Sequence, residues 1–144
     1  MTQSNETAHS SPHVMIPKPD ELDLDLYQAI VRQGGICMQR CTACHAHTHP
    51  PRYYCPACSS PEFSFAPVSG IGVVYSYTVS HMSVEPAWQP HLPFLTLVVE
   101  LEEGPRIVAT ARHIEVASVK IGMPVRVISE AKGTDFVIFW AEPR

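Results

Sequence analysis

Charged side chains, long apolar runs and glycine-rich loops are all scarce in this sequence. Asp, Glu, Lys and Arg make up 17% of its 144 residues. No apolar run approaches the roughly 20 residues of a membrane-spanning helix, and the basic-then-apolar start of a secretory signal is missing. Neither a phosphate-binding glycine loop nor a G-x-S-x-G motif occurs. These absences argue against a membrane protein, a nucleotide hydrolase and a serine hydrolase. We expect a cytoplasmic protein that is not itself an enzyme.

Acidic residues are missing from one segment, although the chain has a formal net charge of −4. Residues 34–60 contain Arg40, Arg52 and three histidines but no acid, whereas residues 61–144 contain nine acids and six bases. A local positive region of this kind suits one phosphate-bearing small molecule or an acidic partner surface. A long nucleic-acid track needs many more phosphate contacts, so nucleic acid is the less favoured partner.

The chain has five cysteines, and four of them have the spacing of metal ligands, which points to a reducing compartment and not to a disulfide framework. Four of them form two C-x2-C pairs separated by ten residues: Cys41, Cys44, Cys55 and Cys58. Two such turns that face each other across a hairpin complete a tetrahedral four-sulfur site, which is the closed arrangement of structural zinc. Iron uses the same ligands in rubredoxin-like sites. The spacing therefore predicts one structural metal ion per chain, and we expect zinc.

Other metal-type side chains surround these pairs. Cys37 is expected to be a small buried apolar residue, and the alternative is an exchangeable fifth ligand or a reactive thiol. His45, His47 and His49 alternate between the two pairs. A solvated hairpin is favoured for them over a second metal site or an anion contact.

The N-terminal third of the chain divides into three predicted parts. Residues 1–19 are polar and contain three prolines, which predicts a disordered tail. Residues 20–34 form a helix with Asp20 as its cap and a glycine pair at its end. Its apolar stripe, which includes Leu26 and Ile30, docks on its own chain or, alternatively, on a partner subunit. Residues 35–66 form the metal-binding ribbon.

Residues 67–144 alternate between apolar and polar side chains and predict five strands, at residues 71–79, 95–101, 106–111, 123–129 and 135–141. A short connector at residues 114–120 has helical potential. A long first strand and a connector between the third and fourth strands are typical of an OB-type barrel. The predicted fold is mainly β: an N-terminal helix, a rubredoxin-like zinc ribbon and a five-stranded OB-fold barrel. The following aromatic and apolar residues are assigned to the barrel core: Tyr75, Tyr77, Phe136, Ile138 and Trp140.

Residues 81–92 form the longest irregular stretch, and loops at this position of OB folds carry ligands and partners. Met82, Trp88 and Phe94 are candidates for an apolar wall beside an acyl-CoA, with Arg52 and Arg40 as the cations for its phosphates. A hydrogen bond from Arg52 to a hairpin carbonyl is an equal alternative. For Trp88, an anchor at a subunit interface is favoured over the acyl-CoA wall.

The order of these motifs resembles a known family. The motifs are Cys41-Thr42-Ala43-Cys44, Pro50-Pro51-Arg52, Cys55-Pro56-Ala57-Cys58, Gly72-Val73-Val74-Tyr75-Ser76-Tyr77-Thr78, Leu97-Val98-Val99-Glu100-Leu101 and Ile121-Gly122-Met123-Pro124-Val125. Across residues 22–143 the chain resembles the acyl-CoA-associated OB-fold family with an N-terminal rubredoxin-like zinc ribbon, first catalogued as domain of unknown function thirty-five. It departs from that family at His45 and Ser59, where glycine usually follows each C-x2-C pair.

The resemblance implies a non-catalytic subunit that binds and supports a thiolase-fold or related acyl-CoA-processing enzyme, such as a thiolase, acyltransferase or retro-aldolase complex. It also implies one structural zinc and a possible contact with a CoA thioester. Two alternatives stay open: a stand-alone acyl-CoA-binding protein and, less favoured, a module for single-stranded nucleic acid. The second needs exposed aromatic side chains in a positive groove, whereas the barrel aromatics are assigned to the core.

Overall fold

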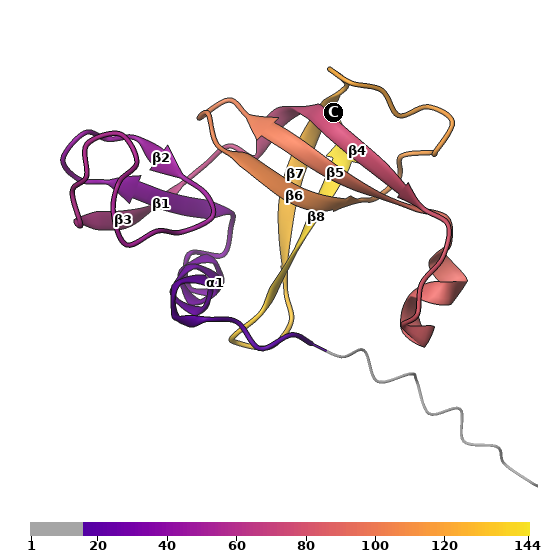
Figure 1. Cartoon of the computed structure of the whole chain (residues 1–144), viewed down its shortest axis with the longest axis horizontal. Coiled ribbons are helices and arrows are strands. Elements are labelled where there is room, and N and C mark those ends of the chain that lie inside the picture. Colours follow the sequence, from indigo (N-terminus) through magenta and orange to yellow (C-terminus); the bar gives the residue numbers. More distant parts are fainter. Residues whose placement is uncertain (1–15) are drawn as a thin grey trace, which may run out of the picture.

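The computed structural model describes residues 16–144. Most of the predicted tail, residues 1–19, lies outside the described residues. The described chain has an N-terminal helix, a three-stranded ribbon and a closed five-stranded barrel (Figure 1). The predicted fold class is therefore confirmed. Among the described residues, no helix combines the length and the apolar character needed to cross a bilayer.

The helix α1 spans Glu21–Gln33, between the cap residues Asp20 and Gly34. The Asp20 carboxylate accepts a hydrogen bond of 2.8 Å from the backbone N–H of Asp23, and Gly34 ends the helix in the left-handed region with φ 68°. The apolar stripe packs on its own chain, because its buried residues form one cluster with Cys37 of the ribbon and Val137 of the barrel. This helix consequently joins the ribbon to the barrel.

The ribbon is a small antiparallel sheet in the order β2-β1-β3. Its strands are β1 (Cys37–Cys41), β2 (His47–Thr48) and β3 (Phe63–Pro67). The central strand β1 is almost entirely buried between its neighbours, the helix and the barrel. Met38 reaches the barrel core cluster, while Cys37 belongs to the helix cluster. This alternation fixes the ribbon against both of its neighbours.

Five strands close the barrel in the order β4-β5-β6-β8-β7, in which β6 and β8 are parallel and the other pairs are antiparallel. This is the strand order of an OB fold. The strands are β4 (Ile71–Ser80), β5 (Phe94–Leu101), β6 (Arg106–Ala111), β7 (Pro124–Ala131) and β8 (Val137–Pro143). The β4–β5 connection carries the short 3-10 helix η1 (Pro86–His91). The connector at residues 114–120 contains turns and no helix.

The prediction of which β4 side chains face the barrel core is wrong. Gly72 and Val74 are buried, whereas the side chains of Tyr75 and Tyr77 are 47% and 37% exposed. Gly72 lies directly on β5, because a Cβ atom there would lie 2.3 Å from the carbonyl oxygen of Glu100. A register shift between Val74 and Ser76 then interrupts the alternation of the strand. The two tyrosines therefore lie at the surface of the barrel.

The inner face of β8 is also the opposite of the predicted one. Val137 and Ala141 are buried and Phe139 packs against them, so this set faces inward. The predicted set, Phe136, Ile138 and Trp140, is half-buried and lines a surface pocket. Both alternating sets of this strand are apolar, and the sequence pattern alone does not distinguish them.

Candidate metal centre and barrel pocket

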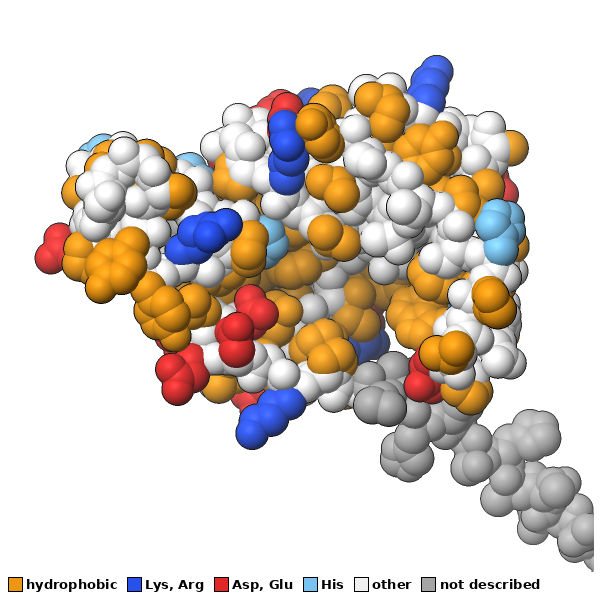
Figure 2. All heavy atoms as spheres, viewed as in Figure 1, with side chains coloured by type: hydrophobic (Ala, Val, Ile, Leu, Met, Phe, Trp, Pro, Cys, Tyr) orange, Lys and Arg blue, Asp and Glu red, His pale blue; other side chains and the backbone are white. Residues whose placement is uncertain are grey.

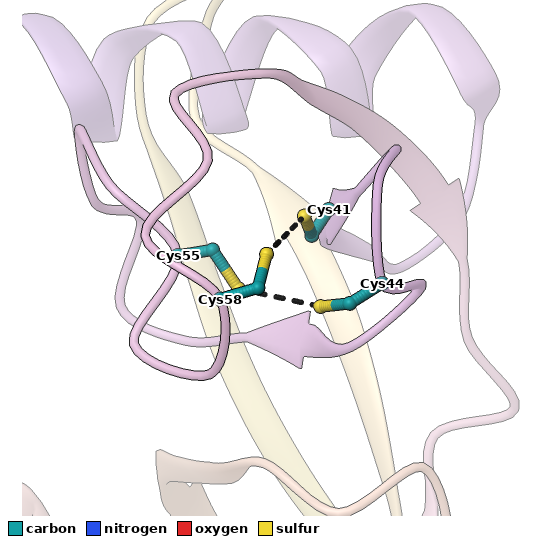
Figure 3. Close-up of side chains that lie close together, drawn as sticks. All are labelled: Cys41, Cys44, Cys55 and Cys58. Atoms are coloured by element: carbon teal, nitrogen blue, oxygen red, sulfur yellow. Dashed lines mark hydrogen bonds between the residues drawn. The ribbon is translucent and has the colours of Figure 1, made fainter.

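The four paired cysteines meet at the tip of the ribbon (Figure 3). Cys41 is the last residue of β1, Cys44 follows in the next turn, and the other two come from the turn before β3. The sulfur atoms of Cys41 and Cys58 are 3.6 Å apart, as are those of Cys44 and Cys55. All four sulfurs lie within 4.8 Å of one another. Tetrahedral zinc–sulfur bonds of about 2.3 Å place sulfurs about 3.8 Å apart, so the geometry fits one ion.

Both C-x2-C turns have the same backbone geometry. The N–H of His45 donates to the carbonyl of Cys41 at 3.0 Å, and the N–H of Ser59 donates to the carbonyl of Cys55 at 2.8 Å. His45 and Ser59 take φ values of 64° and 63°, which is the left-handed region that favours glycine. The chain thus keeps the turn at both positions where it departs from the family pattern.

The electrostatics of the ribbon tip favour a thiolate at Cys41 but not at Cys58, where the backbone N–H of Ser60 lowers the pKa and the neighbouring thiols and burial outweigh it and raise the pKa to about 12. The backbone N–H of Cys44 is the largest influence that lowers the pKa of Cys41 to about 6, and the N–H of Ala43 and the neighbouring thiols act in the same direction against burial. Thiolate is the form of cysteine that binds metal. The sulfurs of the set supply four ligands, so an ion bound here has no open position for water or substrate. The site is suited to hold the ribbon together and is unsuited to metal catalysis.

The remaining candidate ligands lie elsewhere. Cys37 is buried against α1, and burial raises its pKa to about 11, so it is neither a fifth ligand nor a reactive thiol. In the part of the chain that the structure describes, the four cysteines form the one cluster with metal-binding geometry. His49 packs edge-on against Phe139 with ring centroids 6.2 Å apart, and burial lowers its pKa to about 4. Among the described residues the three histidines do not form a metal-binding cluster, and His49 is packed against the barrel instead of being solvated as the favoured prediction had it.

The two arginines of the ribbon have different environments. Arg40 uses its Nε to donate a hydrogen bond of 3.2 Å to the carbonyl of His45, and so supports the first C-x2-C turn. The side chain of Arg52 is exposed, while its backbone is held on both sides by the buried amide of Gln39. Gln39 was not predicted to have a role, because a lone glutamine in a strand carries no motif.

A pocket of about 720 Å³ lies at one end of the barrel. Trp88 and Phe94, from the β4–β5 connection and the start of β5, form one wall and lie 5.0 Å apart between ring centroids. Trp140 of β8 also lines this pocket, and most of the side chains that line the pocket are apolar. Figure 2 shows a recess lined by hydrophobic side chains near the position of η1 in Figure 1. Met82 is 82% exposed and does not line this pocket.

The structure divides the predicted acyl-CoA contacts into two groups. Trp88 and Phe94 share the pocket, whereas Arg40 and Arg52 belong to the ribbon. The ribbon and η1 lie at opposite ends of the molecule (Figure 1). The two arginines therefore do not supply the charge of the barrel pocket.

Trp140 is held in place by a charged network behind the pocket. Its Nε1 donates to the carboxylate of Glu130 at 2.7 Å, and Arg112 donates to the same carboxylate at 2.8 Å. Lys132 is the third donor to Glu130. Hydrogen bonds from Lys132, Trp140 and Arg112 lower the pKa of Glu130 to about 2. The guanidinium of Arg112 also lies over the Trp140 ring, 4.4 Å from its centre.

The fold and the metal centre together define a zinc-ribbon protein with an OB barrel, in which the metal site is structural. Residues 29–64 match the family described as "ChsH2, rubredoxin-like zinc ribbon domain", and residues 66–128 match "ChsH2, C-terminal OB-fold domain". A solved structure described as "Ltp2-ChsH2(DUF35) aldolase" has 32% sequence identity and a TM-score of 0.75, over 89% of this chain and 98% of that chain. The chain belongs to this DUF35 family, as its motifs predicted.

Two curated relatives carry related descriptions. The chain is 34% identical over 124 residues to a probable enoyl-CoA hydratase alpha subunit of Thermomonospora curvata, which covers 85% of this chain and 38% of that protein. It is 34% identical over 90 residues to a DUF35 domain-containing scaffold protein of Methanocaldococcus jannaschii, over 62% of this chain and 63% of that protein. The chain thus spans less than two thirds of either relative. A Sulfolobus solfataricus DUF35 structure, with 16% identity and a TM-score of 0.56, shares the fold.

Proposed function

We propose that this protein is a non-catalytic subunit that binds and supports an acyl-CoA-processing enzyme, with a thiolase-fold aldolase or a related hydratase or thiolase as its partner. The observation that carries the proposal is the match to 98% of the DUF35 chain of a structure described as an aldolase. The relatives described as hydratase alpha subunit and scaffold protein support the same class. The closed four-sulfur site adds that the metal is structural.

The surface of the barrel offers a place for a partner to dock. Val73 and Tyr75 of β4 and Val108 of β6 are exposed, and the strand register places them on neighbouring strands around β5. The guanidinium of Arg106 lies over the Tyr75 ring, 3.5 Å from its centre. We call these four residues the barrel patch. Tyrosine and arginine are enriched at the centres of protein interfaces, where they contribute most of the binding energy.

The ribbon tip offers a second exposed surface. Tyr53 and Tyr54 are among the most exposed aromatic residues of the described chain, and they follow the exposed Arg52. Since residues 34–60 contain no acid, this tip is complementary to an acidic surface. A partner enzyme that contacts both the tip and the barrel patch would hold the small subunit at two points.

Affinity capture from the native host tests the proposal. We expect a thiolase-fold, hydratase or aldolase subunit to be recovered in near-equal amount with the tagged chain. The double variant Tyr75→Ser with Val108→Ser should lose most of that partner, while Val116→Ser, an exposed substitution outside the patch, should keep it. Recovery of the tagged chain without any partner would contradict the proposal. Equal recovery of the partner by the unchanged chain and both variants would contradict the assigned surface.

One observation supports the alternative of a single-strand-binding module. Tyr75 and Tyr77 were predicted to be buried, and this prediction is wrong. An aromatic side chain with a stacked arginine therefore does lie on the barrel surface. However, Arg106 is already paired with Glu100 at 2.9 Å, so the patch has little net positive charge for phosphates. Titration with a short single-stranded oligonucleotide at physiological salt separates the two functions, and we expect no saturable binding.

A further inference from the structure

The N-terminal end of the described chain reaches the pocket at the end of the barrel. Ile16 and Pro17 belong to the lining of this pocket, together with Trp88 from the β4–β5 connection and Trp140 of β8. Ile16 is 52% exposed, so it lies at the rim. Since the structure describes residues 16–144, the chain that precedes Ile16 starts at the mouth of an apolar cavity of about 720 Å³.

The connection between Ile16 and α1 is short and stiff. Near its start, α1 is anchored beside the pocket, because the ring of Tyr27 packs edge-on against the lining residue Phe136 with centroids 5.4 Å apart. Between Ile16 and the helix, Pro17 and Pro19 have a fixed φ and favour extended backbone at the residue before each of them. This connection therefore has little freedom to carry Ile16 away from the pocket.

The residues that precede the described chain match the chemistry of the pocket. Val14 and Met15 are apolar, and residues 7–17 contain no Asp, Glu, Lys or Arg. The pocket has no free charge to offer either, because the ammonium of its lining residue Lys132 is bonded to Glu130. A neutral apolar segment enters such a site without the cost of desolvating a charge.

The size and the walls of the pocket also suit two apolar side chains. A cavity of about 720 Å³ corresponds to a cube about 9 Å on a side, and two extended residues span about 7 Å. Trp88 packs against Phe94, and Trp140 is held by its hydrogen bond to Glu130, so the aromatic walls are fixed. Methionine adapts to irregular space, and its sulfur makes favourable contacts with aromatic rings.

We propose that Val14 and Met15 occupy the barrel pocket, so that the N-terminal segment acts as a tethered plug which any other apolar occupant must displace. A group on a short tether competes at an effective concentration in the millimolar range. Even a weak contact therefore keeps the pocket covered in the free chain. The plug does not depend on which enzyme the chain supports.

Tryptophan fluorescence of the full chain tests the plug, because the chain has two tryptophans and both line the pocket. Val14→Asp with Met15→Asp puts two charges into the proposed plug and should expel it from the pocket. We expect quenching by acrylamide, which is neutral, to become at least twofold stronger. The neutral apolar dye Nile red should bind at least fivefold more tightly. Thr2→Asp with Ser4→Asp adds the same two charges outside the plug and should change neither result.

A conservative pair completes the comparison. Val14→Ile with Met15→Leu keeps two apolar side chains and should leave quenching and dye binding unchanged. Equal results for all four proteins, or equal gains in both acidic variants, would overturn the proposal. Protection of the tryptophans that rises with protein concentration would place the segment in the pocket of a second copy, and it would overturn the tethered plug. None of these readouts involves a partner enzyme, so the plug can fail while the proposed function holds.

Discussion

The side chain of Gln39 clamps the backbone of Arg52. Its Nε2 donates to the Arg52 carbonyl and its Oε1 accepts from the Arg52 N–H, both at 2.8 Å. Gln39 is only 5% exposed and lies in β1, whereas Arg52 lies in the loop between the two C-x2-C turns. This pair of hydrogen bonds resembles the pairing of two residues in an antiparallel sheet. It fixes the distance between β1 and the loop that leads to the second cysteine pair.

Loss of this clamp should destabilise the ribbon. Gln39→Leu keeps a similar volume but leaves the N–H and carbonyl of Arg52 without their partner, and each unpaired group costs about 1–3 kcal/mol when buried. Since the Arg52 site is only partly buried, we expect a loss of roughly 2 kcal/mol in the free energy of unfolding. Urea denaturation of the zinc-loaded protein measures it. Gln89→Ala, at an exposed glutamine, should change it by less than about 0.5 kcal/mol, and equal effects would refute the clamp.

The metal centre predicts which cysteines matter for zinc content. Protein purified under reducing conditions should carry one zinc per chain, and Cys55→Ser should lower the content to near zero because three thiolates no longer close the site. Cys37→Ala should keep the full content, because Cys37 packs against α1. Elemental analysis of the three proteins decides the point. Full zinc in Cys55→Ser, or its loss in Cys37→Ala, would contradict the assignment.

The close approach of β4 and β5 leaves no room for a side chain at Gly72. A Cβ at this position would lie 2.3 Å from the backbone carbonyl oxygen of Glu100 and 2.8 Å from Val99 Cγ1. Gly72→Ala should therefore destabilise the protein by about 1–3 kcal/mol, since β4 must move away from β5. At Gly35 nothing lies within 4 Å and φ is not positive. Gly35→Ala should be neutral or stabilise by up to about 1 kcal/mol. Thermal denaturation of both variants compares them, and similar melting temperatures would be contrary to this account.

Burial of His49 gives the stability a pH dependence. Burial lowers the pKa of His49 to about 4 from its ordinary value of 6.5. Between these two pH values the unfolded chain therefore binds a proton that the folded chain does not. The stabilisation is fully present above about pH 6.5 and falls as the pH drops towards 4, by at most roughly 3 kcal/mol. In His49→Phe, which keeps a ring against Phe139, this loss should be smaller. Denaturation curves at several pH values test it, and parallel pH profiles for the two proteins would show that His49 does not titrate on unfolding.

The metal centre and the positions of the barrel strands were predictable because each has a strong local signal. The spacing of Cys41, Cys44, Cys55 and Cys58 fixes where the thiolates converge, and the alternation of apolar residues marks all five barrel strands. The caps of α1 at Asp20 and Gly34 follow equally local rules. In each case the information lies within a few residues of the feature.

The inner faces of β4 and β8 were mispredicted because they depend on contacts between strands. Tyr75 and Tyr77 have the alternation of core residues, but the bulge after Val74 and the contact of Gly72 with β5 put the other face inside. In β8, Trp140 and Phe139 are both apolar, and only the closed barrel decides which one points inward. The pocket was missed for the same reason, since three of the residues that line it, Phe136, Ile138 and Trp140, were assigned to the core. Gln39 was missed because its partner is a backbone far along the chain.

Reconstitution with the captured partner shows whether this chain supports the activity of another enzyme. The partner enzyme is purified alone and then combined with this chain, and turnover of its acyl-CoA substrate is measured together with the mass of the complex. The account predicts a stable complex with near-equal subunit amounts, a partner activity that rises or is maintained only in the presence of this chain, and no turnover by this chain alone. Turnover by the isolated chain, or an unchanged partner that forms no complex, would contradict it.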